Sequence, residues 1–281
     1  MTSWCGKYGV LEMGFEVDSS GRSVLRHLHR EVPMVVQQAL YFDEHLPHLP
    51  CVYILSSGGP HLEGDHYRVD IRLGEGAMAQ ILTGAATIIA PMEYSGAELR
   101  QTITLGEGAY LEWLPQAIIP AARSRYTAHT EMVVAPSATL FFSEVVACGR
   151  LHSGERFDYR ELELRESVFR PNGSVIARAG ARIVPEEFSP SERAFMGTFT
   201  HFGSIVVVTP PEICSKLLSL LSPNVSEELR VSVASLRGNN GLSLRLLGHS
   251  SERILREIRD ICSMVRQEVK GAPLQEEFPW R

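Results

Sequence analysis

The side chains with the clearest capacity for metal or proton chemistry lie in a glycine-rich segment, residues 56–66. It reads SSGGPHLEGDH and carries His61, Glu63, Asp65 and His66. Imidazole and carboxylate groups are ligands for borderline divalent ions. An aspartate in a glycine-rich corner also commonly accepts backbone N–H bonds. The segment therefore predicts either a weak ion site or a structural turn.

A second group surrounds Glu144, which is followed by Gly149, Arg150 and Glu155. Glu144 stands among apolar neighbours in a run typical of a strand, and a carboxylate buried without a partner is costly. Arg150 can pair with Glu144 or with Glu155. The pattern is compatible with a structural ion pair and equally with a functional carboxylate.

Other motifs carry less chemistry. Residues 74–79, GEGAMA, fit the loose dinucleotide pattern Gly-x-Gly-x-x-Ala, but that fingerprint opens a helix directly after its glycines. Here Gly84 follows within two turns, and the second copy of the motif runs into Pro115. A β-turn with glycine at a positive-φ position explains both copies. His27 and His29 are flanked by arginines, which favours a solvated strand over a metal pair.

The elements that must position these side chains are mostly strands. The sequence LGEGA occurs at residues 73–77 and 105–109, and a degenerate copy, VAPSA, occurs at 134–138. Fixed-period repetition is the signature of stacked units that bury a shared interior. We therefore expect strand, tight turn and strand to recur along the chain. Residues 24–29 and 34–41 are also predicted as strands.

After residue 210 the pattern changes. Apolar spacing predicts helices at 212–221 and 251–269, the second with Ser250 or Ser251 as its N-cap, and a hairpin between them at 228–247. The predicted fold is mainly β, a β-helix-like stack with a small C-terminal α+β part. Its predicted organisation is a stack over residues 1–210 with repeat units at about 65–160, a helix-hairpin-helix part packed on it over 211–270, and a tail over 271–281.

Composition excludes several classes of protein. The formal net charge is −6, so the chain lacks the basic surface of a general nucleic-acid binder. No apolar run approaches the ~20 residues that span a bilayer, and the N-terminus lacks a signal-peptide layout, so we expect a cytoplasmic location without membrane contact. The 5 cysteines are scattered, which supports neither a disulfide framework nor a structural zinc site.

A set of ordered motifs resembles the UreD family of urease accessory proteins, called UreH in some bacteria. They are YILSSGG at 53–59 with Gly-Asp at 64–65, LGEGA at 73–77, LTGAAT at 82–87, LEWLPQ at 111–116 with IIP at 118–120, and SE, GR and GERF at 143–144, 149–150 and 154–157. Two departures stand out. The family usually has Gly-Gly-Asp where this chain has Glu-Gly-Asp at 63–65, and a Thr-rich segment where it has 87–91.

The resemblance implies a non-catalytic scaffold or chaperone for urease maturation. Such a protein binds the urease apoprotein and a UreF-like partner, which brings a UreG-like GTPase; nickel is transported cargo, and no cofactor is tightly bound. Carried over to this sequence, the motif and ion-route candidates are Gly58, Gly59, Gly64, Asp65, Glu144, Gly149, Arg150 and Glu155. Weak, transient ligands would be Asp65, Glu144, His61 and His66. The alternative is a β-fold metalloenzyme built on His61, Asp65 and His66.

Overall fold

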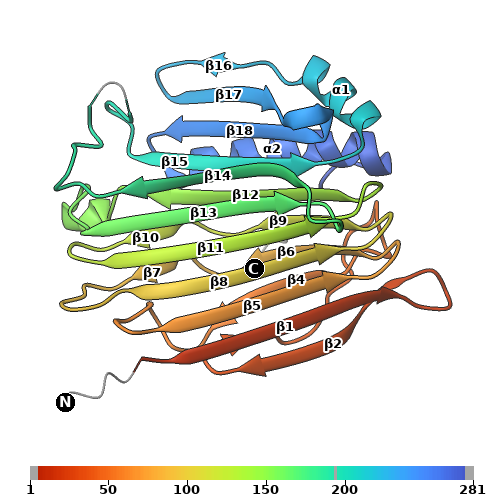
Figure 1. The fold of residues 1–281 in the computed structure, drawn as a ribbon, viewed down its shortest axis with the longest axis horizontal. Helices are drawn as coiled ribbons and strands as arrows, with labels where there is room; N and C mark the ends of the chain where they lie inside the picture. Colours follow the sequence, from red (N-terminus) through yellow and green to blue (C-terminus); the bar gives the residue numbers. More distant parts are fainter. Residues whose placement is uncertain (1–5, 193–194, 276–281) are drawn as a thin grey trace.

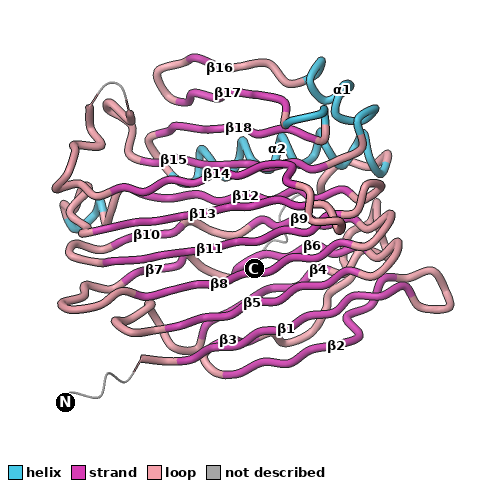
Figure 2. Tube along the Cα trace, in the orientation of Figure 1, coloured by secondary structure: helices cyan, strands magenta, loops and turns pink. Residues whose placement is uncertain are grey.

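Two β-sheets packed face to face form the body of the molecule, and two α-helices cover the outer face of one of them (Figure 1). The computed structural model describes residues 6–192 and 195–275. Residues 276–281 of the predicted tail lie outside the described residues. Loops gather at the two ends of the strands (Figure 2). The predicted mainly β stack with a small C-terminal α+β part is confirmed.

The first layer is a seven-stranded sheet with the order β14-β13-β11-β8-β5-β1-β2. Its five central strands are parallel, and an antiparallel strand closes each edge. In chain order the strands are β1 (Tyr8–Val17), β2 (Ser23–Glu31), β5 (His66–Leu73), β8 (Ala97–Leu105), β11 (Arg125–Val134), β13 (Glu161–Phe169) and β14 (Val175–Ile183).

The second layer is an eleven-stranded sheet with the main order β16-β17-β18-β15-β12-β9-β6-β4-β3, to which β10 and β7 add at one side. Its strands are β3 (Met34–Val35), β4 (Cys51–Ser56), β6 (Met78–Thr83), β7 (Thr87–Ile89), β9 (Tyr110–Leu114), β10 (Ile118–Pro120), β12 (Thr139–Ala147), β15 (His201–Val208), β16 (Asn224–Val225), β17 (Leu229–Ser235) and β18 (Gly241–Gly248). The predicted hairpin, β17 with β18, extends this sheet from β15.

One predicted strand is much shorter than expected. Of residues 34–41, only β3 pairs as a strand, and a single bridge joins Leu40 to Cys51. The carbonyl of Val36 accepts a hydrogen bond from the Arg30 guanidinium. A side chain therefore takes the place of a neighbouring strand there.

The repeated LGEGA motif forms the tight turn of successive coils. Leu73 pairs with Leu105, and Leu105 with Val134, so the repeats are in register across the sheet. The Ala77 and Ala109 amides close the first two turns onto the carbonyls three residues earlier, at 3.1 and 3.2 Å. The glycines at the fourth position of the motif, Gly76 and Gly108, both have φ = 67°. The predicted positive-φ glycine turns are confirmed.

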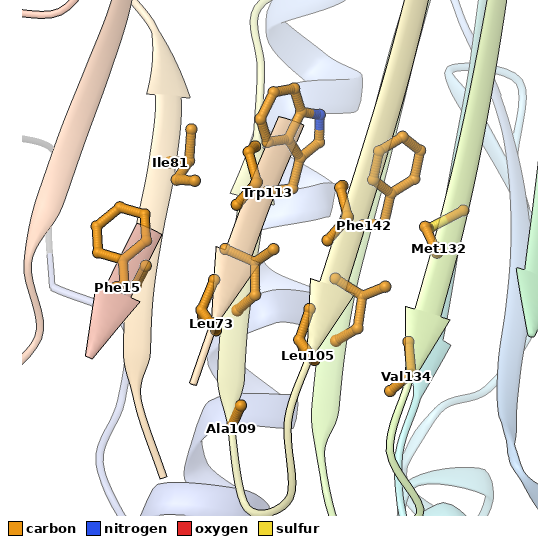
Figure 3. Packing of buried hydrophobic residues seen from close by; sticks show 14 of the residues in the cluster. Phe15, Leu73, Ile81, Leu105, Ala109, Trp113, Met132, Val134 and Phe142 are labelled. Atoms are coloured by element: carbon orange, nitrogen blue, oxygen red, sulfur yellow. The ribbon is translucent and has the colours of Figure 1, made fainter. Parts of the chain in front are cut away.

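Apolar side chains fill three regions. The largest cluster lies between the sheets at the turn end, where Leu73, Leu105 and Val134 form a column beside Trp113 and Phe142 (Figure 3). A second lies between the eleven-stranded sheet and the helices, and a third at the opposite end of the interior. Each fully buried large apolar side chain stabilises the fold by about 1.5–3 kcal/mol.

The helices are α1 (Pro211–Leu220) and α2 (Ser251–Lys270), with short 3₁₀ turns η1 (Leu151–Ser153) and η2 (Arg237–Asn239). Ser250 caps α2 by accepting a bond from the Arg253 amide at 3.2 Å, as predicted. Gly271, in a left-handed conformation, ends it. No helix in residues 6–192 and 195–275 is long and apolar enough to cross a membrane.

A buried ion cluster fastens α2 to the sheet. The fully buried Arg266 guanidinium donates two bonds to Glu112, Nε to Oε1 at 2.6 Å and Nη2 to Oε2 at 2.7 Å, and a further bond to Asp43. Tyr110 and Gln80 donate to the same carboxylate at 2.5 and 2.7 Å. These partners replace the water that the ions lose on burial.

Candidate functional site

Asp65 lies just before β5 and is fully buried. Its Oδ1 accepts a bond from the Lys7 amide at 2.8 Å, and its Oδ2 accepts bonds from the Leu62 amide at 2.8 Å and the Tyr67 hydroxyl at 2.9 Å. The Lys7 ammonium lies 3.2 Å from Oδ2. Burial opposes ionisation, but these donors outweigh it and lower the pKa of Asp65. Both carboxylate oxygens of Asp65 are therefore used in hydrogen bonds that hold the loop before β5 against residue 7.

Glu63 also has a structural contact. Its carboxylate accepts bonds from three successive backbone amides, those of Glu93 at 3.1 Å, Tyr94 at 2.5 Å and Ser95. It thereby holds the loop that leads into β8. Glu63 stands where the family usually has glycine. This departure therefore adds hydrogen bonds between the loop before β5 and the loop before β8.

The predicted metal ligands of residues 56–66 are not brought together. His66 is exposed on the outer face of β5, where Nδ1 lies 3.2 Å from Glu98 and the ring stacks on Tyr8. Asp65 points inward, since successive residues at a strand project to opposite faces. In the part of the chain that the structure describes, no group of three His, Cys, Asp or Glu side chains is placed to hold a metal ion. Gly58, Gly59 and Gly64 lie in the loop between β4 and β5.

His61 is half-buried, with its ring against the interior of the stack. Its ring packs against Tyr67 at 4.3 Å and against the edge of Tyr126 at 5.6 Å between centroids. Its backbone bridges to Ile89, which continues the row of β7 and β10. Burial lowers the pKa of His61 to about 4, more than the charge of Asp65 raises it. The Nδ1 atom is buried and has no hydrogen-bond partner among the described residues.

Glu144 points into the interior from β12 and meets Glu166 of β13, a residue of the opposite sheet. Ser204 donates to Oε1 of Glu166 at 3.0 Å, whereas no donor of another described residue reaches the buried Oε2 atom of either glutamate. Burial, and next the neighbouring Glu166 carboxyl, raise the pKa of Glu144 well above its usual value, and Arg245 opposes this change. Two facing carboxyls of this kind favour one retained proton.

These residues belong to a polar belt that crosses the interior between two apolar regions. Paired residues of neighbouring strands project to the same face. In the seven-stranded sheet Gln101, Thr130 and Glu166 are paired, and in the eleven-stranded sheet Glu144 is paired with Ser204. We call these five residues the polar belt. The amide Nε2 of Gln101 is also buried, and no described residue is its hydrogen-bond partner.

A line of polar side chains connects Asp65 with the belt. Asp65 accepts from Tyr67, the Tyr67 ring contacts His61, and His61 contacts Tyr126. Burial raises the pKa of Tyr126, and the charge of Glu144 raises it further. The two acidic residues singled out in the sequence therefore lie at opposite ends of one line of side chains.

Arg150 and Glu155 lie outside this line. Arg150 Nε donates to Glu155 Oε2 at 2.9 Å, and the same oxygen accepts from the Ala122 amide at 2.9 Å. The bond from Arg150 is the main cause that lowers the pKa of Glu155 to about 2. A Cβ on Gly149 would lie 2.8 Å from the Glu155 carbonyl oxygen, so this approach requires glycine. Of the two partners predicted for Arg150, the structure selects Glu155.

Four belt residues were not singled out in the sequence: Gln101, Thr130, Glu166 and Ser204. The signal that could have found them is strand alternation. Leu162, Leu164 and Val168 share the inward parity of Glu166. Reading residues 161–169 with a period of two would have placed this glutamate inside.

Repeated parallel coils with carboxylates in their interior define a β-solenoid-like protein with a polar core. Comparison with known proteins adds the family. The family model described as UreD urease accessory protein matches residues 7–281. Urease accessory protein UreD 2 of Brucella suis biovar 1 (strain 1330) is 37% identical over 279 residues, which cover 98% of this chain and 92% of the relative.

Two further relatives agree. Urease accessory protein UreD 2 of Methylorubrum extorquens (strain PA1) and urease accessory protein UreD 3 of Methylorubrum populi (strain ATCC BAA-705 / NCIMB 13946 / BJ001) are each 38% identical over 281 residues, covering 98% of this chain and 90% of the relative. The chain belongs to the UreD family of urease accessory proteins. The resemblance read from the motifs is confirmed, and with it a role in urease maturation.

Proposed function

We propose that this chain is a non-catalytic maturation factor that binds the urease apoprotein and a UreF-like partner, through which a UreG-like GTPase joins. Nickel would then pass through or along the chain to the urease active site. Family membership over residues 7–281 supports the maturation role. The interior of the stack supports the transit of an ion.

Three buried atoms that no donor of another described residue reaches carry the nickel part of the proposal. They are Oε2 of Glu144, Oε2 of Glu166 and Nδ1 of His61. The proton retained by the two glutamates lies between them, so the cost of about 1–3 kcal/mol for a buried polar atom without a partner falls on Nδ1 of His61. Carboxylate oxygen and imidazole nitrogen are also ligands for a borderline divalent ion. A passing ion would give these atoms a partner.

The ligands are spread along a line, which favours transit over storage. A fixed metal centre gathers three or four ligands at bonding distance. Here Glu144 and Glu166 form one station and His61 another, with Tyr126 between them. Asp65 holds the hydroxyl of Tyr67, whose ring packs against His61, and its own oxygens are taken up by Lys7, Leu62 and Tyr67.

Ion binding at the glutamate pair would release a proton. The raised pKa of Glu144 means that the pair retains a proton when the site is empty. A divalent ion requires the ionised form and displaces that proton. Loading is therefore expected to improve as pH rises.

The test is activation of urease in a strain whose own copy of this chain is deleted. The deletion should abolish activation, and the intact chain should restore it. The double variant Glu144→Gln/Glu166→Gln should retain complex formation but reduce activation at limiting nickel at least fivefold. Glu131→Gln, on the exposed outer face of β11, is the matched control.

Two results would contradict the proposal. Full urease activation in the deletion strain would remove the maturation role, and full activation by the double variant at limiting nickel would remove the ion route. The metal content of the purified chain adds a third criterion. About one tightly held ion per chain would favour the alternative, a metalloenzyme site.

A further inference from the structure

The two sheets of the stack end at different strands. The seven-stranded sheet stops at β14, whereas the eleven-stranded sheet continues beyond β15 through β18, β17 and β16. Figure 1 shows these last strands extending past β14. In the described residues, no strand of the first layer covers the inner face of β17 and β18. A hollow of about 580 Å³ lies there, between β14 and β18.

The polar belt ends at this hollow. In the seven-stranded sheet Glu166 pairs with Ala179, which lines the hollow. In the eleven-stranded sheet Glu144 pairs with Ser204, and Ser204 pairs with Arg245, which also lines the hollow. Paired residues of neighbouring strands project to the same face. The glutamate pair is therefore one strand away from the hollow in one sheet and two strands away in the other.

Only small side chains stand between the glutamates and the hollow in these rows. They are Ala179, which is half-buried, and Ser204. Glu144 itself is not fully buried, although its Oε2 atom is. At the other end of the belt the row continues from Gln101 to the apolar and buried residues Val69 and Leu11. The belt is thus closed at that end and open toward the hollow.

Arg245 is the charged group at this opening. Its side chain is exposed, and among the described residues no carboxylate forms a salt bridge with it. Two strand spacings, about 10 Å, separate its backbone from that of Glu144. Its positive charge reaches the interior, since it opposes the rise in the pKa of Glu144. A guanidinium in this position attracts the glutamates and repels a divalent cation that approaches from the hollow.

We propose that Arg245 is an electrostatic barrier at the open side of the polar belt. It keeps divalent cations of the bulk solution away from the glutamate pair and prevents a nickel ion in transit from leaving through the hollow. Arg245 acts by its charge and not as a ligand, because a guanidinium has no lone pair to offer a metal. The inference rests on the ion route of the proposed function and adds what confines the ion to it.

Nickel titration of the purified full chain by calorimetry tests this role. Arg245→Gln should bind nickel at least fivefold more tightly than the unmodified chain, whereas Arg245→Lys, which keeps the charge, should bind like the unmodified chain. Combination of Arg245→Gln with Glu144→Gln/Glu166→Gln should abolish the gain, because the gain arises at the pair. The gain should also shrink at high salt, since the charge of an exposed arginine is screened. A purely structural role of Arg245 would give no such salt dependence.

Arg178→Gln is the matched control. Arg178 also lines the hollow, but its guanidinium lies 5.9 Å from the Phe169 ring, and its side chain is on the outer face of β14. Its removal should leave the affinity for nickel unchanged.

Three results would overturn the inference and leave the ion route in place. They are an unchanged affinity in Arg245→Gln, an equal gain in Arg178→Gln, and a gain in Arg245→Gln that persists without the two glutamates. Nickel binding that is the same with and without the two glutamates in every variant would instead remove the ion route, and the inference with it. The two failures are therefore distinguishable.

Discussion

Glu144 and Glu166 face each other across the interior of the stack, one from each sheet, and no donor of another residue among 6–192 and 195–275 reaches the buried Oε2 atom of either. Their rows are fixed by pairing, Glu144 opposite Ser204 and Glu166 opposite Thr130. The pair is therefore a consequence of how the sheets are stacked. It gives the apolar interior a site that responds to protons and cations.

The stability of the chain should fall as pH rises because of Glu144. Its pKa is raised from 4.5, so the folded state holds a proton that the unfolded state has lost. The stabilising contribution is complete below about pH 4.5 and is lost as pH rises toward the raised pKa, by about 1.4 kcal/mol for each pH unit between the two pKa values. Glu144→Gln should flatten this dependence and increase the free energy of unfolding at pH 7.

Urea unfolding between pH 5 and pH 8 measures the effect. Glu131→Gln, outside the interior, should keep the pH dependence of the unmodified chain. The same pH dependence for Glu144→Gln and the unmodified chain would show that the pair does not hold a proton.

His61 should remain neutral in the folded chain at pH 5.5. Burial lowers its pKa from 6.5 to about 4, so its contribution to stability is complete above pH 6.5 and is lost as pH falls toward 4. The loss amounts to about 3 kcal/mol. Imidazole resonances in an NMR titration report the charge directly. His61→Phe keeps a ring between Tyr67 and Tyr126 and should remove most of the acid-side loss; a His61 ring that titrates near pH 6.5 would show that the ring is not shielded from water.

Asp65→Asn should destabilise the chain by about 2–4 kcal/mol. The amide NH₂ would face one of the donors that now bind the carboxylate, and a buried donor would lose its acceptor. Tyr67→Phe removes one of these bonds and should cost about 1 kcal/mol. Urea midpoints at unchanged slope give both values. If Asp65→Asn has the same urea midpoint as the unmodified chain, the loop before β5 does not depend on this carboxylate for its stability.

Arg266→Ala should cost about 3–5 kcal/mol, because Glu112 would remain buried next to Asp43 without its cation. The double variant Arg266→Met/Glu112→Leu removes both charges of the bidentate pair and should recover a large part of the loss. Thermal unfolding of the single and double variants separates the two cases. A double variant less stable than Arg266→Ala would show that the pair is net stabilising.

The turns and the C-terminal elements could be predicted from the sequence because their signals are local. In LGEGA the glycine at the fourth position, the closing alanine and the alternating strand before them lie within a few residues. Helix α2 shows its apolar stripe and its Ser250 cap in the same way. The recurrence of the motif at 73–77, 105–109 and 134–138 then indicated that these turns lie one above another.

The candidate site depended on contacts between distant segments. Nothing near residue 65 indicates that the Lys7 amide will bind its carboxylate, and nothing near Glu144 indicates Glu166. The sequence predicted an ion pair for Arg150 but left its partner open, and the loop after β12 decided for Glu155. These partners are set by pairing between segments that are far apart in the sequence. The residues that adjoin each carboxylate in the sequence do not reveal which distant segment will pair there.

By itself the sequence determined the stacked β fold, its glycine turns, its two C-terminal helices and its family, since these follow from local conformational preference, periodicity and ordered motifs. Only the tertiary structure decided that Asp65 is fully bonded and that Glu144 and Glu166 meet in the interior. The physical reason is that burial and pairing arise when the sheets close on each other. A carboxylate that meets several hydrogen-bond donors, as Asp65 does, stays ionised and holds its loop in place. A carboxylate that meets a second carboxyl, as Glu144 does, retains a proton.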